Sequence, residues 1–344
     1  MNNMKKLNIL IVLSLILSLS SVGQDYSLSQ MNESPVLLNP ANTGLASAIR
    51  INMNYRQQWR SISKPFNTII ASADGKILSQ GSSGSSLGLG ILIVNDQAGT
   101  SKMSTLNANL AIMGKVMLNE KQSLSAGIIG GLMQRKIDVD KLTWTDQFNG
   151  TSYDSSIPHG EIFTSEKRTA PDVGVGLQWS YGRGSATLSS NDAIGAQVGF
   201  AAYHVNMPNT GFHEDDDRRY VRFLVHSSFS YGIKNTPLQL NPIIIAQIQG
   251  PARMYYGGTY IKYRLQESSR YTGNLFARSL NAGMFYRFGD SFVAVMQLEY
   301  DQFAFGISYD INMSQLTTFT YGRGAMEISL RYIPVRPSKG NTLL

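Results

Sequence analysis

The residues with the widest chemical repertoire in this sequence are its histidines, because the chain contains no cysteine. The four histidines are His159, His204, His213 and His226. Their separations match no zinc-ligand spacing, and no thiolate is present to complete a ligand set. We therefore expect these side chains to be polar groups of loops or of an interior, and we expect neither a metal site nor a disulfide framework.

An acidic run, Glu214-Asp215-Asp216-Asp217, could offer carboxylates to a cation. Calcium loops space their oxygen ligands along the chain and turn at a glycine, and this run has neither the spacing nor the glycine. Two arginines, Arg218 and Arg219, follow it directly. We interpret the run as part of a solvated loop.

Catalysis by a Ser/His/Asp arrangement would need His226 to meet a carboxylate such as Asp192 or Asp74, and nothing in their spacing requires it. The Gly-Ser stretch from Gly81 to Ser86 lacks the lysine and the following helix of a phosphate-binding loop. The sequence therefore predicts neither an enzyme nor a bound cofactor.

The long stretch between Val139 and Pro171 mixes aromatic, aliphatic and charged residues, which is typical of a surface that binds a protein. We expect a second stretch, from Asn206 to Arg218, to share this role. The residues expected to contact the partner are Trp144, Phe148, Tyr153, Phe163, Phe212 and Asp216. The alternative, a loop that folds back over its own molecule, stays open.

The N-terminus has the pattern of a secretory signal peptide. Lys5 and Lys6 precede an apolar run from Leu7 to Leu19, and small and polar residues follow it. We expect residues 1–23 to be removed by cleavage after Gly23. The run is shorter than the roughly 20 apolar residues of a membrane-spanning helix, and no later run is long enough either. Such an exported chain could cross a membrane only as a closed β-barrel.

The basic residues are distributed singly along the chain. The whole sequence carries a formal net charge of +7, but no dense basic block accompanies it. A nucleic-acid-binding protein gathers its basic residues on one face or along one element. We therefore expect no nucleic acid among the partners.

From Ile49 onward the dominant pattern is an alternation of apolar residues with polar or small ones, bounded by Gly, Asn, Asp and Ser. The clearest runs are 87–93, 106–112, 173–181, 221–229, 280–288, 303–309 and 326–332. With weaker runs, such as Asn67–Leu78, Leu238–Ile248 and Met254–Leu265, the sequence gives about fourteen strands, an even number as in outer-membrane barrels.

Aromatic residues gather at the ends of these strands, as they do in the girdles at the two interfaces of a membrane. They include Trp59, Trp179, Tyr181, Tyr231, Tyr300, Tyr309 and Tyr332. The opposite face is small or polar, with glycines such as Gly88, Gly174 and Gly283 that suit a crowded interior better than the solvated face of a β-sandwich. The sequence therefore predicts an all-β fold, an outer-membrane β-barrel of about 14 antiparallel strands over residues 48–333, with a periplasmic tail at 334–344.

Loop lengths predict the orientation of this barrel. Outer-membrane barrels have short periplasmic turns and longer outer loops. The stretch from Val139 to Pro171 should therefore face the outside, and the first strand should run outward. The other connections expected on this side are Ser61–Asn67, Asn95–Lys102, Asn206–Arg218 and Ile311–Thr318.

The stretch from Asn32 to Trp59 combines a compact turn with a two-faced strand. Asn39-Pro40 favours an extended or turned backbone, because the proline ring restricts the residue before it. We expect residues 24–47 to be a periplasmic or lumenal N-terminal segment on the periplasmic side of the first strand. The segment could fold into the lumen as a plug, with Asn39 and Asn42 meeting the inward row of the first strand, or it could only cap the lower rim. The plug and lumen residues are Asn39, Pro40, Asn42, Arg50, Asn52, Asn54 and Arg56.

Several motifs at both ends and in the middle of the chain resemble one known family. They are Gln24–Gln30, Leu38–Gly44, Tyr55–Trp59, Pro171–Gly176, Phe305–Asp310 and Glu327–Tyr332. These motifs are similar to those of PorP/SprF-type membrane proteins, which accompany the type IX secretion system of the Bacteroidota. Asn42 and Thr43 stand where the family more often shows Tyr and Ala. Before Glu327-Ile328, this chain has Gly322–Ala325 where the family more often has a Gly-Ser-His-like sequence. Neither change alters the strand pattern.

The resemblance implies an outer-membrane barrel that works with the secretion machinery. It would help to export a large secreted protein with a C-terminal secretion domain, or would anchor such a protein, for example a gliding adhesin, at the cell surface. Its partners would be that cargo protein, type IX secretion components and outer-membrane lipid. An outer-membrane channel or small-ligand transporter is the alternative, favoured by the polar face of the first strand.

Overall fold

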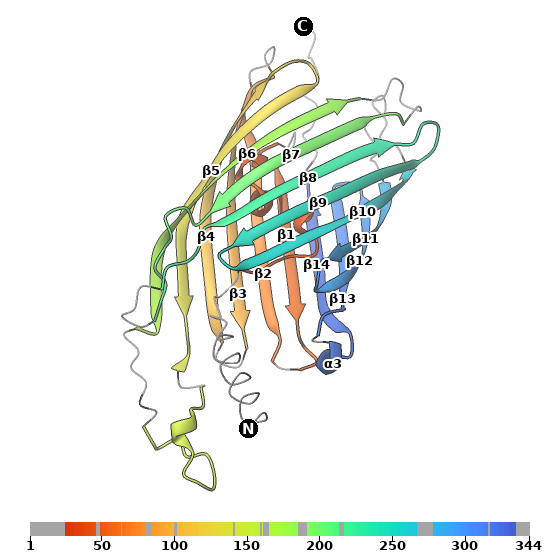
Figure 1. Ribbon diagram of the computed structural model, residues 1–344. Coiled ribbons are helices and arrows are strands. Elements are labelled where there is room, and N and C mark those ends of the chain that lie inside the picture. Colours follow the sequence, from red (N-terminus) through yellow and green to blue (C-terminus); the bar gives the residue numbers. More distant parts are fainter. Residues whose placement is uncertain are drawn as a thin grey trace, which may run out of the picture.

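The computed structural model describes residues 25–45, 49–62, 64–79, 84–99, 102–139, 142–158, 160, 165–184, 191–212, 217–266, 278–315 and 317–334. Fourteen strands lie within these residues: β1 (Arg50–Gln58), β2 (Phe66–Ser79), β3 (Ser86–Ala98), β4 (Met103–Met117), β5 (Gln122–Lys136), β6 (Lys167–Arg183), β7 (Ile194–Tyr203), β8 (Arg222–Gly232), β9 (Leu238–Gln249), β10 (Ala252–Gln266), β11 (Arg278–Arg287), β12 (Ser291–Tyr300), β13 (Phe303–Asn312) and β14 (Arg323–Tyr332). Each strand pairs antiparallel with its neighbours in sequence, and β1 pairs with β14 to close a barrel (Figure 1). The predicted all-β barrel is confirmed.

Alternate residues of each strand face the outside and the lumen, because successive side chains of a strand point to opposite faces. In β13, Phe305, Ile307 and Tyr309 are exposed on the outside, whereas Ser308 and Asp310 are buried inside. Closure gives every strand two hydrogen-bonded neighbours. The backbone N–H and C=O groups of the strands are therefore paired within the barrel, as a membrane interior requires. The outer surface is thus apolar, whereas the lumen combines polar side chains with a cluster of buried apolar ones.

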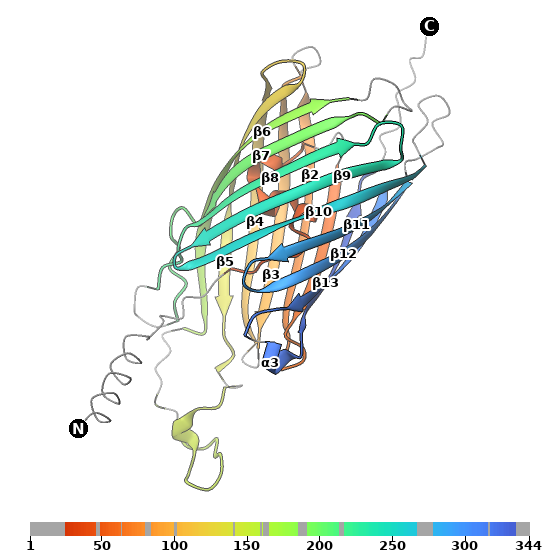
Figure 2. The same ribbon diagram turned by 45° about the vertical axis from the view of Figure 1, so that its right-hand side comes forward.

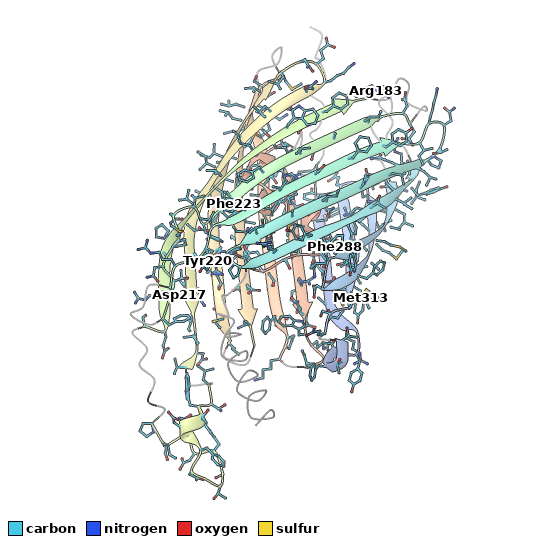
Figure 3. All side chains as sticks on the ribbon, viewed as in Figure 1. Arg183, Asp217, Tyr220, Phe223, Phe288 and Met313 are labelled. Carbon is cyan, nitrogen blue, oxygen red and sulfur yellow. The ribbon has the colours of Figure 1, made fainter. Side chains whose placement is uncertain are left out.

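Aromatic side chains ring both ends of this outer surface, as the sequence indicates. Trp179, Tyr181, Tyr231, Tyr300 and Tyr332 lie at the end where β1 begins, and Tyr55, Trp59, Phe66, Tyr286 and Phe288 lie toward the other end. Trp59 packs edge-to-face against Phe66, with their ring centroids 4.8 Å apart. Figure 3 labels Phe223 and Phe288 among the side chains of this second ring.

The two ends of the barrel differ in their connections. Residues 137–166 and 204–221 join strands at one end, which we call the outer end, because the long connections of outer-membrane barrels face outside (Figures 1 and 2). At the opposite, inner end β1 begins, β14 ends, and short turns at 118–121 and 301–302 join strands. The longest connection is shorter than the sequence pattern indicates, because Pro171 lies within β6 and pairs with β5.

Short helices precede the barrel and lie in its outer connections. They are η1 (Met31–Glu33), α2 (Pro35–Leu38), η2 (Pro40–Asn42), η4 (Thr145–Gln147) and α3 (Thr317–Thr320). Asn39 is extended between α2 and η2, in agreement with the restriction that the following proline imposes. Single helical turns leave no detectable period in a sequence, so none of these was predicted. In the described residues, no helix has the length and apolar character needed to cross a membrane.

Candidate functional site in the lumen and at the outer end

The N-terminal segment, residues 25–45, lies inside the barrel (Figures 1 and 2). Its apolar side chains Leu28, Val36 and Leu37 are at most 4% exposed and belong to one cluster with inward residues such as Ile129 and Leu224. Burial of this kind removes apolar surface from water and holds the segment against the wall. The segment therefore occupies the lumen instead of only covering a rim.

Inward-facing glycines make room for the segment. A Cβ atom at Gly88 would collide with the backbone of Thr43. A Cβ atom at Gly127 would collide with the backbone of Pro40. Only glycine allows backbone to approach this closely. The crowded interior that the glycine pattern predicts is crowded by the chain's own N-terminal segment.

Asn39 is fully buried and makes four polar contacts. Its Nδ2 donates to the carbonyl oxygens of Leu177 and Phe200, at 3.0 and 3.3 Å, and lies 3.1 Å from Nε2 of His226. Its Oδ1 accepts a hydrogen bond from the N–H of Ala41 at 2.9 Å. These contacts tie the turn to β6, β7 and β8, rather than to the inward row of β1, which one of the two alternatives open from the sequence placed beside Asn39.

Asn42 lies where the segment approaches β1. Nη2 of Arg50 donates to the carbonyl oxygen of Asn42 at 3.2 Å and pairs with the carboxylate of Asp74 at 2.8 Å. The same carboxylate accepts a hydrogen bond from the N–H of Gly44 at 2.7 Å. The first inward side chain of β1 therefore fixes the end of the segment.

The other inward residues of β1 are Asn52, Asn54 and Arg56, and all three are buried. Asn52 donates a long hydrogen bond of 3.4 Å to Ser72 on β2. The hydroxyl of Ser34, in the N-terminal segment, donates to Oδ1 of Asn54 at 2.8 Å. The alternation of β1 thus positions the predicted polar row in the lumen.

Arg56 is the centre of a buried ion cluster. It lies 2.8 Å from Asp310 and 3.4 Å from Glu327. Arg287 pairs with Asp310 at 3.1 Å, and Glu327 accepts a hydrogen bond from the N–H of Ser29 at 2.7 Å. Buried charges need such partners, because their desolvation is costly. The sequence analysis did not name the partners of Arg56. Asp310 and Glu327 could have been found as charged residues at the inward-facing positions of two alternating strands.

A second cluster surrounds Asp25 at the outer end. Nε2 of His204 lies 2.7 Å from Asp25, and Nδ1 lies 2.7 Å from Asp172. The guanidinium of Arg219 lies 2.8 Å from the Asp25 carboxylate, and that of Arg222 lies 3.5 Å from the same carboxylate. Burial raises the pKa of Asp25, but the charges of Arg219, His204 and Arg222 outweigh it and hold that pKa well below its usual range. Burial lowers the pKa of His204, but the two carboxylates outweigh it and raise that pKa.

The position of Asp25 corrects one expectation. The sequence reasoning placed residues 24–47 on the periplasmic side of the first strand, whereas Asp25 lies at the outer end, beside the last residue of β9. The N–H of Asp25 donates to Oε1 of Gln249 there, at 3.0 Å. Distance along the chain from β1 does not reveal which way a segment runs through a barrel, so the sequence could not settle this.

The four histidines separate into two groups. His204 and His226 are both 3% exposed and face the lumen, in agreement with an interior polar role. His159 and His213 lie outside the described residues. Neither histidine in the lumen stands alone, because each contacts a side chain of the N-terminal segment.

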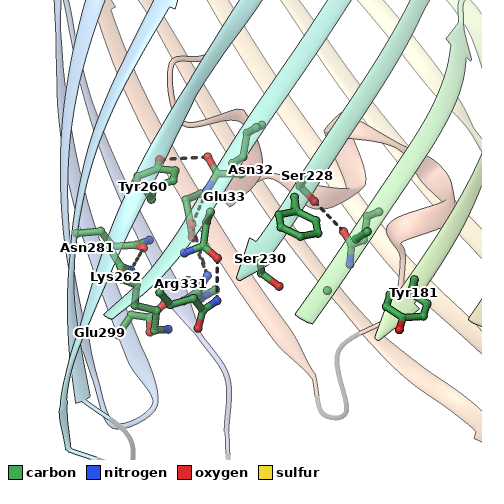
Figure 4. A pocket seen from close by; sticks show the side chains of 18 residues that line it. Asn32, Glu33, Tyr181, Ser228, Ser230, Tyr260, Lys262, Asn281, Glu299 and Arg331 are labelled. Atoms are coloured by element: carbon green, nitrogen blue, oxygen red, sulfur yellow. Dashed lines mark hydrogen bonds and ion pairs between the residues drawn. The ribbon is translucent and has the colours of Figure 1, made fainter. Parts of the chain in front are cut away.

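A cavity of about 330 Å³ remains beside the segment, in the inner half of the lumen (Figure 4). Arg331 lines this cavity and pairs with Glu33 at 3.1 Å and with Glu299 at 2.8 Å. Lys262 pairs with Glu299 as well. The rest of the lining mixes amide and hydroxyl groups, such as Asn281, with apolar side chains, such as Phe229 and Ile243. The charges of this cavity are thus paired with one another.

Part of the longest connection forms a small hairpin that extends away from the barrel (Figures 1 and 2). Three of the predicted partner residues, Trp144, Phe148 and Tyr153, lie in it. Phe148 and Tyr153 form a bridge across the hairpin and are 57% and 49% exposed. Trp144 precedes η4 and is half-buried. This hairpin projects outward instead of folding back over the barrel mouth.

The remaining partner predictions fall elsewhere. Phe212 is buried, and the guanidinium of Arg135 lies over its ring, 5.1 Å from the centroid. It therefore stabilises the base of the β7–β8 connection. Phe163 and Asp216 lie outside the described residues.

Comparison with known proteins identifies the family. The model of the family described as type IX secretion system membrane protein PorP/SprF matches residues 20–332. The chain belongs to this family. The PorP/SprF assignment and the barrel fold establish a protein of the outer membrane that is associated with type IX secretion. No curated protein matches the chain significantly.

Solved structures resemble the PorP/SprF barrel at low identity. The toluene transporter TbuX of Ralstonia pickettii is 10% identical, with a TM-score of 0.46, over 91% of this chain and 96% of that one. The monoaromatic hydrocarbon channel CymD is 11% identical, with a TM-score of 0.45, over 92% and 95%. A Pseudomonas aeruginosa FadL homologue is 9% identical, with a TM-score of 0.44, over 88% and 94%.

Proposed function

We propose that this PorP/SprF barrel helps to export a large secreted protein, or anchors it at the cell surface, by protein–protein binding at the outer end. A gliding adhesin with a C-terminal secretion domain is the kind of cargo that fits this role. The observation that carries the proposal is the filled lumen, because a barrel occupied by its own chain serves better as a support than as a pore. Secretion components and outer-membrane lipid would be its other contacts.

The outer hairpin supplies the second support. Gln147 is buried within it and donates to the carbonyl oxygen of Ile157 at 3.0 Å, so the hairpin has an internal hydrogen bond of its own. Phe148 and Tyr153 are therefore displayed on a structured platform. Exposed aromatic residues of this kind are enriched at the centres of protein interfaces.

Affinity purification from outer membranes tests the proposal. The wild-type barrel should recover a large secreted protein, and the double variant Phe148→Ser/Tyr153→Ser should lose it while still assembling. Phe319→Ser is the matched control, because Phe319 is 68% exposed on another outer connection. Equal recovery by the double variant and the wild type would exclude the hairpin as the binding surface, and no recovered partner at all would contradict the anchor function.

The second candidate function is an outer-membrane channel or small-ligand transporter, which the inner cavity favours. Single-channel conductance separates it from the anchor. A plugged anchor should show no open pore as wild type and should conduct once residues 25–45 are removed. Unchanged conductance after that removal would contradict the plug, and an open wild-type pore would favour the channel.

A further inference from the structure

We infer that the N-terminal end of the exported chain passes through the lumen to the outer end and forms part of the face presented to the medium. This inference concerns the path of the chain, so it holds whichever partner the barrel binds.

The first contacts lie at the outer end. Asp25 meets His204, which directly follows β7, and Arg219, which precedes β8. It also meets Gln249, the last residue of β9. The connections at these strand ends belong to the outer end, where residues 204–221 lie. The segment therefore begins among the outer connections.

The next contacts, on β14, lie deeper in the lumen. Ser29 meets Glu327, in the middle of β14. Glu33 then pairs with Arg331, one residue before the inner end of that strand. Two positions on one strand, met in order, give the segment a direction. This stretch runs toward the inner end. The segment then bends back, because the hydroxyl of Tyr203, the last residue of β7, donates to the carbonyl oxygens of Val36 and Leu37.

The last contacts close the path. Gly44 donates its N–H to Asp74, which also pairs with Arg50, the first residue of β1. β1 begins at the inner end, where β14 ends. The described segment thus begins with Asp25 at the outer end and ends beside the first residue of β1 at the inner end.

The segment is held at both ends, so it cannot slide along the lumen. Asp25 is joined to the connection 204–221 and to β9 by short ion pairs and a hydrogen bond, with its side chain 3% exposed. Gly44 packs against Gly88 at the other end, where a side chain on either residue would collide with backbone. The position of the N-terminal end therefore belongs to the folded structure.

This path has a consequence for export. A signal peptide that stayed attached would be held in the inner membrane by its apolar run. Asp25 could then not reach the outer mouth of a barrel in the outer membrane. Removal of the signal peptide must precede or accompany closure of the barrel around the segment, and the new N-terminus becomes part of the outer face.

Cysteine labelling in intact cells tests the inference, because the natural chain has no cysteine. A Gly-Ser-Cys-Gly-Ser insertion between Gln24 and Asp25 is compared with two single-cysteine controls. Thr151→Cys lies on the outer hairpin and Lys121→Cys lies in an inner turn. A membrane-impermeant maleimide should label the insertion and Thr151→Cys in intact cells, and should label Lys121→Cys only after the outer membrane is permeabilised.

Labelling of the insertion only after permeabilisation would overturn the inference, and so would labelling only after denaturation. Heat-modifiable migration in electrophoresis shows that each variant has assembled. If the insertion prevents assembly, the variant Gln24→Ser replaces it, because an N-terminal glutamine can cyclise and lose its free amine, whereas serine keeps it. A membrane-impermeant amine reagent should modify this amine in intact cells. An N-terminal peptide that stays unmodified in those cells would equally count against the outer location.

Discussion

The side-chain oxygen of Asn39 lies against the Cα of Gly176, in the space that a Cβ atom would fill. Oδ1 of Asn39 accepts from the N–H of Ala41, so it cannot move without breaking the turn that begins η2. The glycine of β6 and the asparagine of the N-terminal segment are thus complementary at atomic contact. This relationship makes the fit of the segment testable from the barrel side.

Replacement of Gly176 by valine should displace the N-terminal segment from its contact with β6. Overpacking of a close-packed interior costs about 1–3 kcal/mol, and a collision with a fixed turn lies at the upper end. We expect a lower urea midpoint and a measurable conductance. Gly182→Ala on the same strand is the control, because nothing lies within 4 Å of the added Cβ. An assembled Gly176→Val barrel that shows no conductance would contradict the conclusion that this contact holds the segment in the lumen.

Arg56→Met should strongly destabilise the barrel. It leaves Glu327 buried without its guanidinium partner, and breaking such a buried pair costs about 3–5 kcal/mol. Adding Glu327→Gln removes the unpaired charge and should restore part of the loss, while Asp310 keeps Arg287. Urea unfolding of the two variants measures the difference. If the double variant is less stable than Arg56→Met, the charge is not the cause.

The exposed residue Arg253 on β10 provides the control for that experiment. Surface substitutions usually change stability by no more than about 0.5 kcal/mol. Arg253→Met should therefore unfold at the wild-type urea concentration. A loss comparable to that of Arg56→Met would point to a general effect of removing a positive charge.

Stability should fall as the pH rises, because of His204. Its pKa in the folded protein is raised above the ordinary value of about 6.5 by Asp25 and Asp172, despite burial. Its contribution is therefore complete below about pH 6.5 and is lost as the pH rises through the folded value. The pKa of Asp25 is lowered, so its contribution is lost only as the pH falls well into the acid range.

Thermal unfolding from pH 5 to 9 measures this loss, with His204→Gln as the comparison. Glutamine cannot become charged, so the variant should start less stable in mild acid and lack the decline toward alkaline pH. Parallel profiles for the two proteins would show that another group titrates in that window.

The outward face of β5 should require apolar residues at the middle of the membrane. Ile128 is 61% exposed there, so Ile128→Arg should cost about 2–4 kcal/mol. Gln134→Arg, on the same face near the outer end, should cost only about 0–1 kcal/mol, because charges are tolerated near the interface. Unfolding from lipid vesicles compares them. Equal costs at the two positions would contradict the proposed depth of the strand.

The alternation of residues from Ile49 onward was enough to predict the strands, their approximate number and the two faces of the sheet. Period-two patterning carries this information because each strand side chain has only two directions available. The aromatic strand ends and the turn at Asn39-Pro40 were also readable, since both depend on local chemistry. β6 is longer than predicted, because its pairing with β5 continues past the apolar run, as at Pro171.

The tertiary structure alone decided which inward residues meet. Arg56 pairs with Asp310 and Glu327, which come from the other end of the chain and reach it only through closure of β1 on β14. The same holds for Asn39 against Gly176 and for Asp25 against His204. Spacing along a sequence fixes neither the register of a closed sheet nor the direction of a segment within it. The sequence therefore determined the barrel, and folding determined what fills it.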